Sequence, residues 1–447
     1  MKSPRPLTLT RREVVAGALA ATVLPAWAQS VPSEPDVVIV GAGAAGITAA
    51  QTLISKGKTV VVLEAANRVG GRAFTESSTF GVPFDHGCSW ISAASANPYK
   101  GLAEEFGYEL LNHNSPGEAL FVGDRRANAI ERRKYDSAWG RIQAALTKAG
   151  QDGLDVAAST VIPEKMDFSG VCQSWIGPMD YGVDFKDLST LDNWNSADSN
   201  PNLMVKEGHG ALVLKQSAGL PIQLNTPATR IDWSGEGVSV STPSGDIRAK
   251  ACIVTASPGV LASGSIKFTP DLPVWKRDAV NNLPMGLLAK IALQFDGERF
   301  DLRPNDWLTY WVSDDVPTPA CYFLTWPFDF NLMIGFVGGD FGWELSRSGS
   351  DAAIDFALGE LVKIMGSDIR KHFVKGYLTD WASNPLTLGA YAAPRPGHYG
   401  ARQSLAKPIA DRIFFAGEAV AGEYVALCGG AHLSGGSVAN DVAAILS

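Results

Sequence analysis

Residues 36–46 read DVVIVGAGAAG, a short β-branched run that leads directly into a glycine-rich turn. Residues compatible with a helix follow to about Lys56, and a second β-branched run, TVVVL at 59–63, ends in Glu64. This order of strand, tight turn, helix, strand and acid is the context in which a GxGxxG motif binds a dinucleotide. We therefore predict an α/β fold, α+β overall, that contains a Rossmann-like parallel sheet.

Each residue of the glycine-rich turn has an expected role. Gly41 permits the turn, Gly43 lets the backbone approach a pyrophosphate, and Gly46 lets the helix pack against the strand; Ala45 is expected to contact the cofactor with them. The N-terminus of the helix supplies N–H donors for the phosphates. The carboxylate of Glu64 can accept both ribose hydroxyls and would repel a 2′-phosphate, which disfavours NADP.

A second glycine pair favours FAD over NAD. The sequence NRVGGR at 67–72 follows Glu64 closely. Gly70 and Gly71 let the chain double back close to a phosphate, and the guanidinium of Arg72 adds charge-assisted hydrogen bonds. A soluble NAD dehydrogenase has no need of this second phosphate-binding turn.

Further segments follow in a fixed order along the chain. They read FDHGCSWI at 84–91, ACIVTASPGVL at 251–261, IKFTPDLP at 266–273, PMGLLAK at 284–290, WASNP at 381–385, GAY at 389–391, RIFFAGE at 412–418 and GAHLSG at 430–435. With the glycine-rich turns, this series resembles the flavin-containing amine oxidase family, which includes monoamine oxidases, polyamine oxidases and lysine-specific histone demethylases. Several segments are weak signals alone, but their order and spacing are highly specific.

The resemblance implies where FAD binds. Glu418 follows Gly417 at the end of a buried strand and is expected to accept hydrogen bonds near the ribityl chain or the phosphates. The helix that opens near Leu427 would direct its N-terminal dipole at the flavin N1–C2=O edge. Ala390 stands where monoamine oxidases carry the cysteine that binds flavin covalently, so FAD is expected to be noncovalent. The remaining implied cofactor contacts are Ser89, Trp90 and Ala228, the last in place of a valine that contacts adenine in the family.

The predicted domains are discontinuous. The FAD-binding domain takes residues 30–95, about 200–265 and about 395–447. A mixed-sheet and helical substrate-binding domain takes residues 96–199 and 266–394. The sequence shows no internal repeat and gives no sign of an oligomeric state.

Lys290 is the predicted catalytic residue. In an amine oxidase the neutral amine lies beside flavin N5, a hydride equivalent leaves the α-carbon, and water hydrolyses the resulting imine. By its place in PMGLLAK, Lys290 resembles the family lysine that holds a water at N5 and favours reaction of the reduced flavin with O2.

Three aromatic residues complete the predicted substrate site. Tyr391 and Tyr424 are candidate walls that guide an amine to the flavin, and Trp381 is expected to support the ring. Tyr424 occupies the position used in the polyamine oxidase and demethylase branch, whereas the monoamine oxidase branch places its wall at the position of Leu427. The chain therefore resembles the polyamine oxidase branch more closely.

One departure concerns the substrate. Plant-type polyamine oxidases carry an acid two residues after the tryptophan, to hold a second ammonium, and Ser92 stands there in this chain. Acids from elsewhere could serve instead, and the candidates are Glu104, Glu105, Asp180, Asp184 and Glu207.

Three alternative functions remain open at this point. An L-amino-acid oxidase would need an arginine facing the substrate carboxylate, and no motif designates one. An amine dehydrogenase would pass electrons to a cytochrome or quinone instead of O2. A non-catalytic flavin-binding protein would not need Lys290 or the aromatic pair.

The first 28 residues predict export. A basic start with Arg11-Arg12 precedes a mostly apolar run, and Ala26-Trp27-Ala28 matches a signal-peptidase site. The twin arginines indicate the Tat route, which carries folded, cofactor-loaded proteins to the periplasm. The apolar run is too short for a comfortable membrane span.

Composition narrows the partners. The chain of 447 residues has a formal net charge of -8, which argues against nucleic acid as the main partner. Its 5 cysteines include no CxxC pair, so the sequence predicts no local metal motif, and a disulfide framework is not expected in a chain of this length. We expect a small-molecule amine as substrate, and O2 or a periplasmic electron acceptor.

Overall fold

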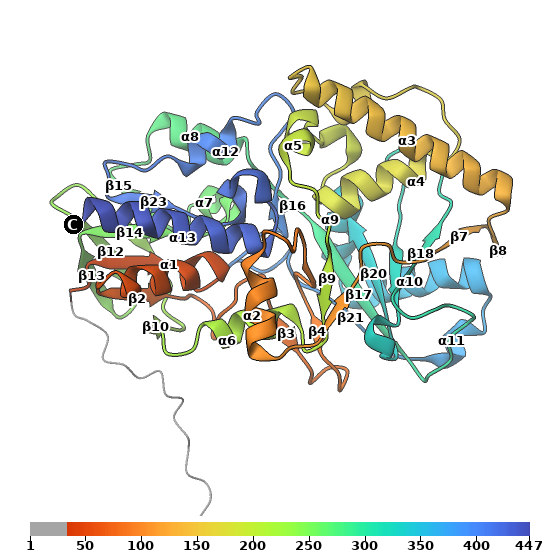
Figure 1. Cartoon of the computed structure of the whole chain (residues 1–447), viewed down its shortest axis with the longest axis horizontal. Coiled ribbons are helices and arrows are strands. Elements are labelled where there is room, and N and C mark those ends of the chain that lie inside the picture. Colours follow the sequence, from red (N-terminus) through yellow and green to blue (C-terminus); the bar gives the residue numbers. More distant parts are fainter. Residues whose placement is uncertain (1–33) are drawn as a thin grey trace, which may run out of the picture.

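The computed structural model describes residues 34–447, and the expected signal segment 1–28 lies outside the described residues. In the left half of Figure 1, helices α1 (Ala44–Ser55) and α13 (Cys428–Ile445) lie side by side. Gly435 makes this approach possible, because a Cβ added there would stand 2.1 Å from the carbonyl oxygen of Ala45. The two helices cover one face of a sheet.

That sheet is parallel and has the order β10-β2-β1-β14-β23. Its strands are β1 (Val37–Val40), β2 (Val60–Leu63), β10 (Ile222–Gln223), β14 (Ala251–Val254) and β23 (Ile413–Phe415). Apolar runs without alternation are typical of parallel strands buried on both faces, as the burial of these strands shows. The predicted discontinuous Rossmann-like sheet is confirmed, because three distant parts of the chain contribute strands to it.

A four-stranded sheet packs on the other face, with the order β13-β12-β11-β15. Its strands are β11 (Arg230–Asp232), β12 (Val238–Thr242), β13 (Gly245–Ala249) and β15 (Lys267–Thr269). Helix α8 (Val274–Asn281) packs nearby against α7 (Pro258–Ser263) and α12 (Ala401–Ala406). The segment from β15 to α8 was expected in the substrate-binding part, and it packs here with the dinucleotide-binding part.

The right half of Figure 1 is organised around a seven-stranded mixed sheet of order β21-β17-β20-β19-β18-β7-β8. The strands are β7 (Glu118–Val122), β8 (Arg125–Arg126), β17 (Leu288–Phe295), β18 (Asp306–Tyr310), β19 (Tyr322–Thr325), β20 (Leu332–Gly338) and β21 (Phe373–Leu378). Helices α3 (Ala129–Gln151), α4 (Ser169–Ser174), α9 (Gly339–Ser348) and α10 (Ser350–Met365) share one buried cluster with it. A mixed-sheet and helical second part is therefore confirmed.

The remaining short elements flank or connect these sheets. They are β3 (Thr75–Glu76), β4 (Phe84–Asp85), β5 (Trp90–Ile91), α2 (Pro98–Phe106), β6 (Leu110–Asn112), α5 (Thr190–Asn195), β9 (Leu203–Val205), α6 (His209–Gln216), β16 (Met285–Gly286), α11 (Ile369–His372) and β22 (Tyr391–Ala392). Strand β16 pairs with β22, which brings the chain before Lys290 next to Tyr391. Among the described residues, no helix combines the length and apolar character that a membrane crossing requires.

Candidate active site

The two glycine-rich turns lie against each other. Gly43 and Gly70 form an isolated parallel bridge, and the N–H of Gly70 donates to the carbonyl of Ala42 at 2.8 Å. A Cβ added at Gly46 would stand 1.9 Å from the carbonyl oxygen of Gly41, whereas one added at Gly43 would meet nothing closer than 4.0 Å. Gly46 is therefore needed for packing, and Gly43 leaves open backbone that a pyrophosphate can approach.

Glu64 lies at the carboxyl end of β2, as the sequence predicts. Its two carboxylate oxygens accept the backbone N–H groups of Ala42 at 2.7 Å and Ala66 at 2.8 Å. Burial raises the pKa of Glu64. Each oxygen keeps a lone pair for a ribose hydroxyl. The N–H of Thr226 donates to the carbonyl of Glu64 at 2.8 Å, so the segment that leads to the buried Ala228 runs alongside this strand end.

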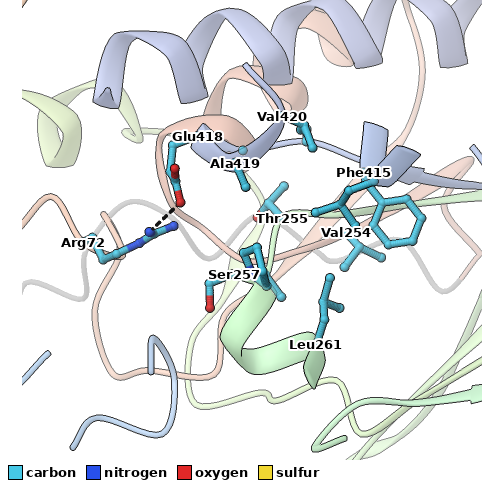
Figure 2. Close-up of a pocket in the computed structure, with 14 residues that line it drawn as sticks. Arg72, Val254, Thr255, Ser257, Leu261, Phe415, Glu418, Ala419 and Val420 are labelled. Atoms are coloured by element: carbon cyan, nitrogen blue, oxygen red, sulfur yellow. Dashed lines mark hydrogen bonds and ion pairs between the residues drawn. The ribbon is translucent and has the colours of Figure 1, made fainter. Parts of the chain in front are cut away.

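Arg72 and Glu418 form an ion pair in the lining of a pocket at the end of β23 (Figure 2). The Nη1 of Arg72 donates to Glu418 Oε1 at 2.9 Å and to the carbonyl of Ala390 at 2.8 Å. The backbone N–H of Ala392 also donates to Glu418, at 3.2 Å. This ion pair joins the second glycine turn to the segment after Gly417, whose N–H donates to Ser434 of α13.

Lys290 is buried on β17 and anchored to the loop between β4 and β5. Its ammonium donates to the carbonyls of Asp85 at 2.8 Å and Gly87 at 2.5 Å, and to the hydroxyl of Ser89 at 2.6 Å. Burial lowers the pKa of Lys290 to about 8. All three N–H groups are used, so a water held at Nζ would have to replace one acceptor, and the rotatable hydroxyl of Ser89 is the one that can turn away.

Lys290 borders an apolar cleft whose empty space is about 480 Å³. Most of its lining is aromatic or aliphatic, and includes Phe84, Trp90, Leu324, Phe328, Phe330 and Phe336. Trp90 stacks on Trp307 with ring centroids 6.0 Å apart and donates to His113 Nδ1 at 3.2 Å. Trp90 and Ser89 were predicted as cofactor contacts, and the structure places both in this cleft beside Lys290.

The predicted aromatic residues occupy separate positions. The hydroxyl of Tyr391 donates to the carbonyl of Met179 at 3.1 Å, and its ring edge packs on Gly182. Tyr424 is half-buried just before α13, and no ring contact joins it to Tyr391 in the described part of the chain. Trp381 is buried and donates to the carbonyl of His86 at 2.9 Å, so it braces the loop that holds Lys290.

Leu427 precedes α13 as its N-cap, and its carbonyl accepts the N–H of Ala431 at 3.0 Å. The N–H groups of the first helical turn have no partner within the helix and can receive an electronegative ligand edge. The helix therefore begins where the sequence predicts the flavin-facing helix.

Asp180 is the candidate acid that the structure places beside the aromatic site. It follows Met179, whose carbonyl accepts the Tyr391 hydroxyl, in the π-helical turn Trp175–Tyr181. Burial, and after it the charge of Asp180, raises the pKa of Tyr391, so the carboxylate lies near that ring. Its side chain is exposed, yet burial by the surrounding protein raises the pKa of Asp180 to about 7. A cation placed near this carboxylate would stabilise its charged form.

The other candidate acids have different surroundings. Glu104 pairs with Lys100 on the surface of α2, where Glu105 is also exposed. Glu207 accepts the N–H of Glu109 at 3.0 Å, and the buried Asp184 accepts the N–H of Asp340 at 3.3 Å. None of these contacts includes the aromatic residues of the site.

Sequence profiles identify the family. The profile described as flavin containing amine oxidoreductase matches residues 44–443. The chain belongs to this family. A flavin therefore fits the site, and the open backbone at Gly43, the free lone pairs of Glu64 and the start of α13 are the features that fit it.

Relatives of this amine oxidoreductase include polyamine oxidases and histone demethylases. Polyamine oxidase 4 of Oryza sativa subsp. japonica is 28% identical over 94% of this chain and 91% of its own length. Lysine-specific histone demethylase 2 of Homo sapiens is 25% identical over 91% of this chain, which corresponds to 53% of its length. These relatives confirm the resemblance to the polyamine oxidase branch.

Solved structures show the same fold. Putrescine oxidase, solved as the wild type bound to putrescine, superposes with a TM-score of 0.76 at 19% identity and covers 92% of this chain and 99% of that one. Cyclohexylamine oxidase from Brevibacterium oxydans IH-35A gives a TM-score of 0.72 at 21% identity, with 92% of this chain and 99% of that one covered.

Sequence reasoning missed a buried ion pair in this amine oxidoreductase. Arg402 of α12 donates to Asp192 of α5 at 2.6 and 2.9 Å, and also to the carbonyls of Ala392 and Ala419. It ties the substrate-side helix α5 to the segment that carries Glu418. No motif signals the pair, because its partners are far apart in the chain.

Proposed function

We propose that this flavin amine oxidoreductase is an FAD-dependent amine oxidase that acts on a primary or secondary amine carrying a second cationic group, such as a diamine or polyamine. The observation that carries the proposal is the placement of Asp180 beside Tyr391, with Lys290 at a neighbouring apolar cleft. The flavin, when bound, supplies the acceptor for the hydride equivalent that leaves the substrate carbon.

The cofactor is FAD, bound noncovalently. The open turn at Gly43, the acceptors of Glu64 and the N–H groups of Arg72 suit the pyrophosphate and ribose of a dinucleotide. Ala390 has no nucleophilic side chain for a thioether link.

The residues of the site select a neutral amine at the reacting end. An apolar, aromatic wall disfavours a charged nitrogen, because an ammonium loses its hydration there. At the other end of the substrate, a second ammonium can donate a hydrogen bond to the carboxylate of Asp180. The positive charge would stabilise the ionised carboxylate, which desolvation disfavours. The names of the relatives, polyamine oxidase and putrescine oxidase, support this assignment.

An L-amino-acid oxidase is less well supported. Such an enzyme needs a cation for the substrate carboxylate. Among the described residues that line the cleft the cations are Lys206 and Lys290 and none is an arginine, and Lys290 already donates to three protein acceptors. Asp180 would also repel a carboxylate.

Anaerobic bleaching of the bound flavin tests the proposal. Putrescine and spermidine should bleach it at low concentration, simple monoamines only at higher concentration, and L-amino acids should not. Bleaching by amino acids alone would establish an L-amino-acid oxidase, and bleaching by no compound would establish a binding protein.

Asp180→Asn should raise the KM for diamines by about tenfold or more, the equivalent of 1.4 kcal/mol, with less effect on monoamines. Asp187→Asn, which changes an exposed acid, is the matched control.

For the localisation and the electron acceptor, we propose Tat-dependent export to the periplasm and reoxidation of the reduced flavin by O2. The twin arginines Arg11 and Arg12 and the Ala26–Ala28 cleavage pattern support export. The buried cation Lys290 supports O2, because negative charge develops as oxygen takes its first electron.

A further inference from the structure

Three potential metal ligands from distant parts of the chain meet beside the active-site loop. Cys88 lies in the loop between β4 and β5, His209 is the first residue of α6, and Cys428 is the first residue of α13. The two sulfurs and an imidazole nitrogen all lie within 4.8 Å of one another. Both cysteines are free.

His209 lacks the contacts that a buried histidine normally has. Its side chain is 0% exposed, and neither ring nitrogen has a hydrogen-bond partner among the described residues. Leaving a buried polar group without a partner costs about 1–3 kcal/mol, so some ligand is expected to satisfy the ring. The backbone around it is well fixed, because the Asp85 carboxylate accepts the N–H groups of His209 at 3.1 Å and Gly210 at 3.2 Å.

We propose that Cys88, His209 and Cys428 bind a zinc ion. Two thiolates and one imidazole are ligands that zinc prefers over the hard divalent cations. A zinc–sulfur bond of about 2.3 Å places two tetrahedral sulfurs about 3.8 Å apart, so the present separation closes by small side-chain rotations. Binding converts two thiols into thiolates and releases two protons to solvent, without any redox change.

The burial of the ligands indicates how the ion enters. His209 is enclosed, whereas Cys88 and Cys428 are half-buried, so the cysteine side gives access and leaves the fourth position for a water or another donor. The rings of Tyr99 and His209 pack edge to face, with their centroids 5.1 Å apart. The buried hydroxyl of Tyr99 has no hydrogen-bond partner among the described residues and can donate to a zinc-bound thiolate.

A zinc ion here would be structural for the active site. It would join the loop that holds Lys290 to the first turn of α13, the helix that faces the flavin. No metal motif is visible in the sequence because the three ligands are far apart along the chain. The proposed zinc site does not depend on which substrate the enzyme oxidises. A negative result in the metal analysis therefore leaves the amine oxidase proposal standing, and a negative bleaching result leaves the zinc proposal standing.

Metal analysis of the holoenzyme tests the inference. The reduced, FAD-loaded protein is incubated with ZnCl2, freed of unbound metal by gel filtration, and analysed by mass spectrometry for zinc. We expect about one zinc per chain, and a loss of about tenfold or more in Cys88→Ser and in Cys428→Ser. Cys172→Ser is the matched control, because Cys172 is buried in the other core and belongs to no ligand cluster, and it should retain zinc.

A second measurement keeps the test independent of how the variants fold. Cobalt added to the wild-type protein should give the visible ligand-field bands of a tetrahedral cobalt thiolate, at wavelengths beyond the flavin absorption. Wild-type protein that retains no more zinc than Cys428→Ser, or that shows no such cobalt spectrum, overturns the proposal. So does a Cys88–Cys428 disulfide in protein purified without oxygen, since oxidised sulfurs cannot serve as thiolate ligands.

Discussion

Replacing Lys290 with methionine should slow the reaction of the reduced flavin with O2 much more than it slows reduction by substrate. The variant keeps most of the side-chain volume and removes the ammonium that donates to Asp85, Gly87 and Ser89. Oxygen acquires negative charge with its first electron, and a nearby cation lowers the barrier to this electron transfer. Hydride transfer from the substrate carbon does not need the same charge.

The magnitude follows from the surroundings of Lys290. With its pKa at about 8, roughly ten ammonium forms exist for each neutral amine at pH 7, so the charge is present under ordinary conditions. One preorganised electrostatic group in a water-excluded site contributes about 2.7–4 kcal/mol. Three protein acceptors share the charge of Lys290, so we expect about 1.4–4 kcal/mol, or one to three orders of magnitude in the reoxidation rate.

The pH dependence provides a second signature. Because burial lowers the folded-state pKa of Lys290 from 10.5 to about 8, the folded protein loses this proton first as the pH rises. Reoxidation in the wild type should therefore fall above about pH 8. The unfolded chain keeps the proton up to about 10.5, so the destabilisation caused by burying this charge is relieved as the pH rises from about 8 to 10.5. The methionine variant should show neither effect.

Stopped-flow measurement separates the two half-reactions. Lys276→Met is the matched control, because Lys276 is also buried and donates to three carbonyls, those of Ser404, Leu405 and Lys407. It should be destabilised like the Lys290 variant and should reoxidise within about twofold of the wild type. If the Lys290 variant retains FAD and reoxidises at the wild-type rate, Lys290 does not act on oxygen.

Three further predictions test other parts of the reasoning. Acid or heat should release FAD from the purified protein, because Ala390 offers no atom for a covalent link; flavin retained in the precipitate contradicts this. Replacing Arg11 and Arg12 with lysine should trap precursor in the cytoplasm, as cell fractionation would show, and undiminished periplasmic activity would exclude dependence on the pair. Arg402→Met should lower the free energy of unfolding by about 3–5 kcal/mol, because it leaves the buried Asp192 carboxylate unpaired. A chemical denaturation curve with an unchanged midpoint would contradict this.

The dinucleotide-binding unit can be predicted from neighbouring residues alone. The run from Val37 to Glu64 carries its own strand, turn, helix and acid, and the steric need for Gly46 follows from contacts within this one unit. Local chain geometry fixes such features, so a pattern of neighbouring residues suffices to predict them. The helix start at Leu427 followed instead from the resemblance to the family, because Leu427 makes no side-chain capping bond that a local pattern could signal.

Contacts between residues that are distant along the chain follow from the packing of the whole fold. The sequence offered five acids of equal standing, and the fold placed Asp180 beside Tyr391. It also turned the hydroxyl of Ser89 to Lys290, paired Arg402 with Asp192, and gathered two cysteines and a histidine from separate segments. These contacts depend on how sheets and helices from remote parts of the chain pack together. Packing between remote segments sets the burial and desolvation of each group, and residue spacing along the sequence does not predict it.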